Sequence, residues 1–599
     1  MIFNAITRIG RRGLLADLVV ATFPLLMLTR ALQVDANFGG MTDCRTCFAW
    51  AAIASDSGLF VLLLLLYGML LVTPGRALQL LLKLLMLGLL LLYLVDLILL
   101  DMMAIRLNFS EALKYATAIG PTYDIVRGYI AEASPLLWIS AALGVVLVVA
   151  FLLAPVTAGR WRWRALGLCG GLAALLWLFV PRVAYVHSWG YENVVQVNLS
   201  SGVMVAYSDP FIAELKERNE SRDALACRDT PAPASRPNIV LVILESFSMH
   251  HSNFFSGLND FTPQLDRIAR ENRAHTNFHA NGFTTEAGLL ALLTGRISLP
   301  IVEENNLGAG VSFQGGFNLE ETLPKRLRSE GYYSAFLTSG DLGFLDKEAW
   351  LKSIGFDHTE GHQQRFYRNW PRFHFQAAPD RALYLRSQRV IEALEQRDRP
   401  FLAVIETVST HLPFINPETG ERSEAAALAY ADRALGEFYD RMVRSGYFTR
   451  GGVMLIVSDH RTMTPISPGE RERFGDRAES LVPLVVVDPE RASKGIDTAL
   501  GQQTDLVESL LGRVSGRLCP SFFGSDLFDP ASSADCVFHG SGVVKERVSV
   551  LCSGAPAAVV RLNGDDTAFE GKAPARGQLI LDYLNSERLR RLSGRYNLN

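Results

Sequence analysis

The stretch NIVLVILES, residues 238–246, is a short apolar run that ends on Glu245 and Ser246. Its β-branched residues and its length are typical of a buried strand. Directly before it, the three prolines of TPAPASRP interrupt regular structure. We therefore expect a folded domain to begin at residue 237.

Four similar apolar runs follow this strand along the chain. They are YYSAFLTSGD (332–341), FLAVIETVST (401–410), GGVMLIVSDH (451–460) and SLVPLVVVD (480–488). The text between them has helical spacing, and strands that alternate with helices predict an α/β domain whose mostly parallel central sheet is covered on both faces. We assign this domain to residues 237–540, and residues 541–599 to a C-terminal extension that packs on it or continues it.

The first ~190 residues have a different composition from the rest. Five stretches are apolar over about the ~20 residues that a helix needs to cross a bilayer, at 14–34, 50–73, 78–103, 133–154 and 162–187. We predict an α-helical five-span membrane domain over residues 1–188, followed by a membrane-proximal helix and linker over 189–236. The net charge of −3 gives no indication of a nucleic-acid partner.

Basic residues near the span ends predict the orientation. They precede the first span, the third span and the fifth span, as Arg8, Arg11, Arg12, Arg76, Arg160, Arg162 and Arg164. These segments should be cytoplasmic, and an odd number of spans then places the α/β domain on the outer side. Each of four aspartates in or beside the spans is open to two interpretations, a functional carboxylate or a packing residue: Asp17, Asp56, Asp96 and Asp101.

Seven cysteines are few for 599 residues. Cys44 and Cys47, and also Cys519 and Cys536, fall on the predicted outer side, where disulfides are tolerated. We predict a bridge between Cys519 and Cys536.

Polar side chains close the predicted strands, and a ligand site in an open α/β sheet lies outside the carboxyl ends of the strands. Glu245 ends the first run, Asp341 the second, His411 follows the third, and Asp459 with His460 ends the fourth. A carboxylate from one strand and an Asp-His pair from another are plausible ligands for a divalent cation, and this donor set suits manganese, magnesium or zinc. Taken singly, each residue is more typical of a helix cap or a surface position, and only the conjunction of three strand ends favours the metal.

Two threonines begin the apolar segment NGFTTEAGLLALLTG, residues 281–295. A threonine hydroxyl becomes a nucleophile when a metal activates it. Thr284 and Thr285 also have the pattern of a helix cap. Both interpretations are compatible, since a helix N-terminus favours bound phosphate.

At these residues the chain resembles the alkaline phosphatase and sulfatase superfamily. The sulfatase catalytic residue opens a pattern that ends in Thr-Gly, and counting back from LLTG places that position on Thr285, not on Thr284. Ala287 and Leu289 replace the Pro and Arg of the pattern. Because threonine cannot become the oxidised aldehyde of sulfatases, we do not expect a sulfatase.

A closer resemblance, over about residues 237–530, is to membrane-anchored lipoteichoic acid synthases and to the phosphoglycerol transferases that decorate periplasmic glucans. It rests on NIVLVILESFS, TEAGLLALLTG, the block at 327–358, STHLPF and SDHRTM. The resemblance implies that Glu245, Thr285, Asp459 and His460 bind one divalent metal, with Mn²⁺ as first choice and Mg²⁺ or Zn²⁺ as alternatives.

The same resemblance implies the roles of other residues. Thr285 would carry a covalent phosphoglycerol group, and His411 would protonate the leaving alcohol or deprotonate the acceptor. Asp341, Phe344 and Lys347 would shape the head-group pocket together with His411. The alternative for Lys347 is a solvated helix residue.

The implied function is transfer of sn-glycerol-1-phosphate from phosphatidylglycerol to a periplasmic glucan or another envelope polysaccharide, with release of diacylglycerol. The expected location is the bacterial inner membrane, with a cytoplasmic N-terminus and a periplasmic catalytic domain. The alternatives are a phosphoethanolamine transferase acting on lipid A or glycan, a sulfatase-fold phosphodiesterase, and a membrane sensor without activity. Phosphoethanolamine transferases of this superfamily have a further His just before a Pro-containing strand, which helps to build a second metal site. The matching segment here, DRAESLVPLVVV, has no His before Pro483, which favours one metal and a glycerol head group. The acceptor and the oligomeric state leave no motif.

Overall fold

The computed structural model gives a description of most of the chain. The described residues are 14–38, 47–103, 106–107, 109, 112, 135–154, 156, 159–178, 191–200, 207–221, 227–230, 236–299, 319–491, 494–519, 523–541 and 546–591. Contacts divide the chain into two compact units, a first that ends at residue 203 and a second whose main part is 204–599. Each unit is described by itself below.

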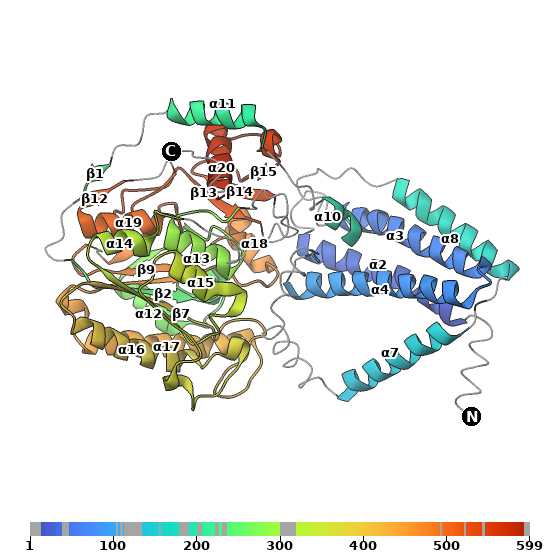
Figure 1. The fold of residues 1–599 in the computed structure, drawn as a ribbon, viewed down its shortest axis with the longest axis horizontal. Helices are drawn as coiled ribbons and strands as arrows, with labels where there is room; N and C mark the ends of the chain where they lie inside the picture. The colour runs from blue at the N-terminus through green and yellow to red at the C-terminus, as the bar shows by residue number, and fades with distance from the viewer. Residues whose placement is uncertain are drawn as a thin grey trace. The chain divides into compact units, whose positions relative to one another are not determined.

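The first unit is helical (Figure 1). Its helices are α2 (Leu14–Phe38), α3 (Cys47–Val72), α4 (Arg76–Met103), α7 (Pro135–Leu153), α8 (Arg160–Leu178) and the short α10 (Val194–Ser200). Among the described residues, three helices are long and apolar enough to cross a membrane, and these are α2, α3 and α4. Helices α7 and α8 lie where the fourth and fifth spans were predicted and are not among these three, so the five-span count stays a prediction.

Each of the four aspartates noted in the sequence has a partner inside the first unit. Asp56 binds Arg30 at 2.7 Å and Asp96 binds Arg106 at 2.8 Å, and all four side chains are buried. Nearer the surface, Asp17 pairs with Arg162 at 2.9 Å and Asp101 accepts a hydrogen bond from Gln33. These contacts favour the packing interpretation, because each carboxylate joins two parts of the chain.

The second unit is built on a central sheet of eight strands in the described part of the chain. Their order is β10 (Gly495–Asp497), β3 (Arg273–His275), β9 (Leu484–Val487), β8 (Val453–Ser458), β2 (Ile239–Leu244), β7 (Phe401–Glu406), β5 (Tyr333–Thr338) and β6 (His358–Glu360). The run from β8 to β6 is parallel, but β9 is antiparallel to both of its neighbours. The sheet is therefore mixed, and the prediction of a mostly parallel sheet is not confirmed in that form.

Helices cover both faces of the sheet (Figure 1), and alternate residues of the buried strands pack on opposite helical layers. Ile239, Leu241 and Ile243 of β2 pack with the layer of α13 (Thr285–Thr294), α14 (Leu323–Ser329), α15 (Lys347–Ser353) and α19 (Asp505–Ser515). Val240 and Val242 pack with α12 (Pro263–Glu271), α16 (Asp380–Glu395) and α17 (Glu424–Arg444). Because both faces of the sheet are covered, its strands read as continuous apolar runs.

The C-terminal part adds a second, antiparallel sheet of β13 (Cys536–Gly540), β14 (Arg547–Cys552), β15 (Ala558–Arg561) and β16 (Ala568–Phe569). Helix α20 (Gly577–Arg591) packs on it through Ile580 and Leu584. Helix α11 (Asp209–Glu220) contacts α20 through an ion pair between Arg218 and Asp582 at 3.0 Å. The core of this part also contains Ile297 and Leu299 from the segment after α13, so the residues beyond 540 pack on the rest of the second unit.

The prediction of a bridge between Cys519 and Cys536 is wrong. Cys519 is bonded to Cys227, and Cys536 is bonded to Cys552. The pairing follows from strand register: β1 (Arg228–Asp229) pairs with β12 (Arg517–Leu518), which brings together the cysteines that flank them, and Cys536 lies directly opposite Cys552 in the β13–β14 ladder.

Candidate active site

The site begins where β2 and β8 end side by side. Leu244 is opposite Ser458 in the parallel ladder, so the residues that follow, Glu245 and Asp459, leave the sheet at the same edge. Glu245, Asp459 and His460 are all buried. The Nε2 atom of His460 lies 3.4 Å from Oδ2 of Asp459 and 3.7 Å from Oε1 of Glu245. The structure thus brings together three residues that the sequence predicted as metal ligands.

Helix α13 adds the fourth predicted ligand. Thr285 is the first residue of the helix, and its Oγ1 lies 3.3 Å from both Oε2 of Glu245 and Nε2 of His460. Thr284 is the N-cap, and its hydroxyl accepts a hydrogen bond from the backbone N–H of Ala287. The two threonines therefore have separate surroundings. The Thr285 hydroxyl faces a carboxylate and an imidazole, whereas the Thr284 hydroxyl bonds the helix backbone.

Close packing of α13 on the end of β8 depends on Gly288. A Cβ atom at this position would lie 2.1 Å from the carbonyl oxygen of Asp459, closer than any real contact. The turn before the helix is held from the C-terminal sheet, because Nδ2 of Asn281 donates to the carbonyl of Phe538 and Nδ1 of His539 bonds the carbonyl of Ala280. The position of Thr285 is thus fixed from both ends of this segment.

The donor atoms fit a divalent cation. Nδ1 of His460 lies 2.7 Å from the carbonyl oxygen of Arg461, which can only accept, so the proton is on Nδ1 and the lone pair of Nε2 points toward Thr285. Oδ1 of Asp459 accepts from the N–H groups of Ser246 and His460, whereas Oδ2 is buried with no hydrogen-bond partner among the described residues. An oxygen-rich set with one imidazole suits Mn²⁺, Mg²⁺ or Zn²⁺.

The electrostatics of the buried carboxylates also favour a bound cation. Burial, followed by the negative charge of Glu245, raises the pKa of Asp459 well above the usual aspartate value. The carboxylates of Glu245 and Asp459 each have an oxygen within 4.8 Å of the other. Two buried negative charges this close are unfavourable unless a positive charge lies between or beside them. A bound cation would supply that charge and let both carboxylates stay ionised.

His411 stands at the edge of the site among aromatic rings. Its Nδ1 bonds the carbonyl of Leu412, which leaves Nε2 of the neutral ring without a proton. The ring packs edge-on against Phe375 with centroids 4.8 Å apart, and Phe375 lies 5.0 Å from Phe344. Phe375 has a φ of 52°, a strained value for a residue with a side chain, and such strain gathers at functional sites.

The remaining predicted pocket residues have partners of their own. Nζ of Lys347 lies 2.7 Å from Oε1 of Glu406 and is largely buried, which rules out the alternative of a solvated helix residue. Burial opposes the charge on Lys347, yet the Glu406 carboxylate raises its pKa above that of an ordinary lysine. Asp341 accepts from the N–H of Gly343 and lies 3.5 Å from Nδ1 of His362.

Glu406 and Ser246 belong to the site and were not singled out from the sequence. Glu406 ends β7 beside Ile243 of β2, and the signal was present, since it closes an apolar run as Glu245 does. Ser246 has a φ of 53° and its hydroxyl donates to Oε1 of Glu245 at 2.7 Å. No sequence pattern identifies a serine in that conformation.

Phosphoglycerol transferases are similar to this chain in sequence. The chain is 26% identical over 324 residues to Phosphoglycerol transferase I of Escherichia coli (strain 55989 / EAEC), and the match covers 50% of this chain and 41% of that protein. The match to Phosphoglycerol transferase I of Shigella boydii serotype 18 has the same extent. Less than half of each relative's length is therefore represented.

Among solved structures, a protein in the alkaline phosphatase superfamily from Vibrio parahaemolyticus is 19% identical with a TM-score of 0.49, covering 65% of this chain and 96% of that one. The lipoteichoic acid synthase LtaP from Listeria monocytogenes is 17% identical with a TM-score of 0.46, covering 67% and 97%. The family model described as Sulfatase matches residues 237–516. Over these residues, which are less than half of the chain, the sequence is similar to the Sulfatase family.

Proposed function

We propose that this protein transfers phosphoglycerol from phosphatidylglycerol to a hydroxyl of an envelope polysaccharide, such as a periplasmic glucan, through a covalent intermediate on Thr285. The observation that carries the proposal is the position of the Thr285 hydroxyl, 3.3 Å from both Glu245 and His460 at the start of α13. Identity to Phosphoglycerol transferase I supports the choice of a phosphotransferase and of the transferred group.

A divalent cation held by Glu245, Asp459, His460 and Thr285 would favour the ionised hydroxyl and polarise the phosphate. In the first step Oγ1 of Thr285 forms a bond to phosphorus, and the bond from phosphorus to the diacylglycerol oxygen breaks. The positive end of the α13 dipole favours the phosphate charge at this position.

His411 is proposed as the proton carrier of both steps. Its Nε2, protonated at the start of the cycle, gives a proton to the departing diacylglycerol oxygen. The neutral ring then accepts a proton from the acceptor hydroxyl as that oxygen attacks phosphorus and the bond to Thr285 breaks. Phe344, Phe375 and the ion pair of Lys347 with Glu406 would line the glycerol pocket, and Asp341 would shape its rim.

The topology that this chemistry requires is also a proposal. Five spans with a cytoplasmic N-terminus would place the sulfatase-family domain on the periplasmic side of the inner membrane, where both lipid head groups and envelope glycans are available. The three helices α2, α3 and α4 support a membrane location, and the arginine distribution supports the orientation.

The test is covalent labelling of the protein in membranes that contain phosphatidylglycerol with a labelled glycerol head group. The wild-type protein should acquire label, and the Thr285→Ala variant should acquire none. Thr284→Ala is the matched control: loss of an N-cap costs about 1 kcal/mol, so this variant should be less stable and still become labelled. Labelling of Thr285→Ala would overturn the mechanism.

The donor and the reaction type are tested in the same membranes. Labelled phosphatidylethanolamine should give no adduct, whereas a phosphoethanolamine transferase would take its head group instead. Supplying a glucan should move label from the protein to the glycan. Release of free glycerol phosphate in place of modified glycan would identify a phosphodiesterase.

A further inference from the structure

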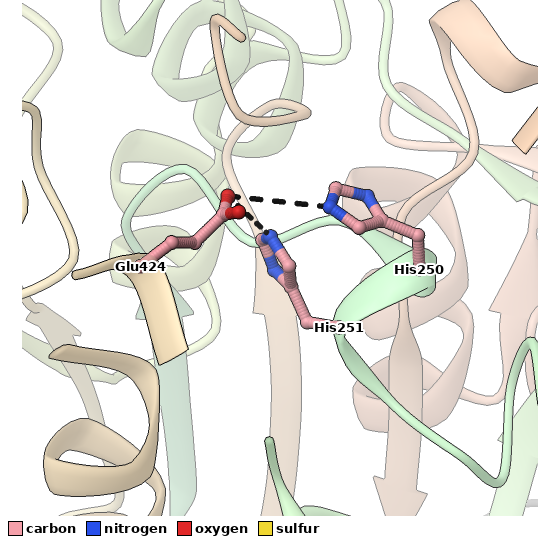
Figure 2. A group of neighbouring side chains, drawn as sticks. All are labelled: His250, His251 and Glu424. Carbon is pink, nitrogen blue, oxygen red and sulfur yellow. Dashed lines mark hydrogen bonds and ion pairs between the residues drawn. The ribbon is translucent and has the colours of Figure 1, made fainter. Parts of the chain in front are cut away.

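A second cluster of metal-binding side chains lies outside the Thr285 site. Figure 2 shows His250 and His251, from the 3₁₀ turn η3 (Met249–His251) after β2, facing Glu424 at the start of α17. Nε2 of His251 lies 3.1 Å from Oε1 of Glu424, and Nε2 of His250 lies 4.0 Å from the same oxygen. One ligand atom from each residue falls within 4.8 Å of the others.

Carboxylates lie on two sides of the cluster. Glu424 faces both imidazoles, and Glu470 lies 2.9 Å from Nδ1 of His250 and pairs with Arg461 at 2.7 Å. A cation held by the imidazoles and Glu424 would place a positive charge beside these carboxylates.

The surroundings of His250 favour the cation. Oε1 of Glu470 lies 2.9 Å from Nδ1, and its negative charge favours the proton on that atom, although the two atoms do not have hydrogen-bond geometry. The lone pair of Nε2 then faces the Glu424 carboxylate, which is itself an acceptor. A carboxylate behind an imidazole is the usual support for a metal-bound histidine. Glu424 is 29% exposed, which gives an ion a path from solvent into an otherwise buried cluster.

His251 opposes the cation, but weakly. Its Nδ1 accepts the backbone N–H of Ser248 at 3.2 Å, which places the ring proton on Nε2. Metal binding through Nε2 moves that proton to Nδ1 and gives up two hydrogen bonds, the one from Ser248 and the one that Nε2 donates to Glu424. Two imidazoles and one carboxylate together hold a transition metal more strongly than two hydrogen bonds hold a tautomer.

We infer that His250, His251 and Glu424 form a second metal site, of the zinc type, that fastens the segment after β2 to the N-terminus of α17. Two nitrogen donors and one oxygen favour Zn²⁺ over Mg²⁺ or Mn²⁺, in contrast with the oxygen-rich Thr285 site. The two sites share no ligand, so this inference is independent of the proposed function.

The test measures metal binding by the full-length protein in detergent, in an Asp459→Asn background that disables the first site. After removal of metal with a chelator, Co²⁺ is added, and bound metal is measured by mass spectrometry and by the visible absorption of tetrahedral Co²⁺. One equivalent should bind, and Zn²⁺ should displace it. Glu424→Gln and His250→Ala should each weaken binding by at least about tenfold.

Glu421→Gln is the matched control, because Glu421 is an exposed carboxylate only three residues from Glu424. It should bind Co²⁺ as the background does. Glu424→Gln changes a partly exposed side chain, so the test does not depend on folding of the buried His250→Ala variant. Equal Co²⁺ binding by Glu424→Gln and Glu421→Gln would overturn the inference, as would the absence of any bound equivalent in the Asp459→Asn background.

Discussion

Gly288 decides how closely the proposed nucleophile approaches its ligands. With no side chain there, the backbone of α13 rests directly on the carbonyl of Asp459, and Thr285 lies one helical turn before this contact. A single methyl group would push the helix away from the end of β8. The geometry around Thr285 therefore depends on a residue that carries no chemistry.

We predict that Gly288→Ala lowers stability by about 1–3 kcal/mol through overpacking, and lowers the labelling rate by about 10- to 100-fold through misplacement of Thr285. Melting temperature and labelling kinetics give the two values. Gly469→Ala is the control, because its Cβ would meet only the Leu258 side chain at an ordinary 3.5 Å. A Gly288→Ala protein with normal kinetics would show that α13 is not held by this contact.

At the scale of elements, the sequence predicted what depends on local pattern. The strands that became β2, β5, β7, β8 and β9 are apolar runs bounded by turns, and their polar ends follow from position alone. The direction of β9 was not predictable, since an apolar run reads the same in parallel and antiparallel ladders. The sequence therefore located the edge of the sheet that carries the site, but it did not predict that β9 is antiparallel to its neighbours.

The cysteine pairing could not be predicted from local sequence patterns. Cys227 and Cys519 are 292 residues apart and meet because two short strands pair, and Cys552 lies in a sheet that the sequence pattern did not reveal. Spacing along the chain gives no measure of such distances. The choice of Thr285 over Thr284 came instead from counting back from LLTG in the resembled pattern, and the structure makes Thr284 the N-cap of α13.

The helices of the first unit are joined by buried ion pairs, which leads to a stability prediction. Asp56 of α3 is bound by Arg30 of α2 and also accepts a hydrogen bond from Tyr93 of α4. Asp56→Asn removes the nearer of the two carboxylates that face the buried Arg30, since Asp96 lies 4.0 Å from Nε of Arg30, and we expect a loss of about 3 kcal/mol. Thermal aggregation of the detergent-solubilised protein measures it.

Asp101→Asn is the matched control for this prediction. Asp101 is exposed and accepts one hydrogen bond from Gln33, which an asparagine can also accept, so its effect should stay within about 0.5 kcal/mol. Equal losses of stability in the two variants would show that burial does not determine how much Asp56 contributes to stability.

At the scale of the whole molecule, the proposed chemistry and the candidate membrane helices lie in different units. All of the proposed catalytic and pocket residues lie between Glu245 and His460, within the second unit, and the three helices of the described part that are long and apolar enough to cross a membrane lie in the first. The second unit should therefore keep the chemical step by itself. The first unit should matter for the supply of a lipid that is confined to the bilayer.

We predict that a fragment of residues 204–599 forms the Thr285 adduct with a soluble short-chain phosphatidylglycerol at a rate close to that of the full-length protein. With phosphatidylglycerol in vesicles its rate should fall by at least about tenfold, because the reaction loses the effective concentration that membrane attachment provides. Circular dichroism checks that the fragment is folded. A folded fragment that reacts equally well with both donors would show that the first unit does not serve lipid supply, and one that reacts with neither would place part of the chemistry in the helical unit.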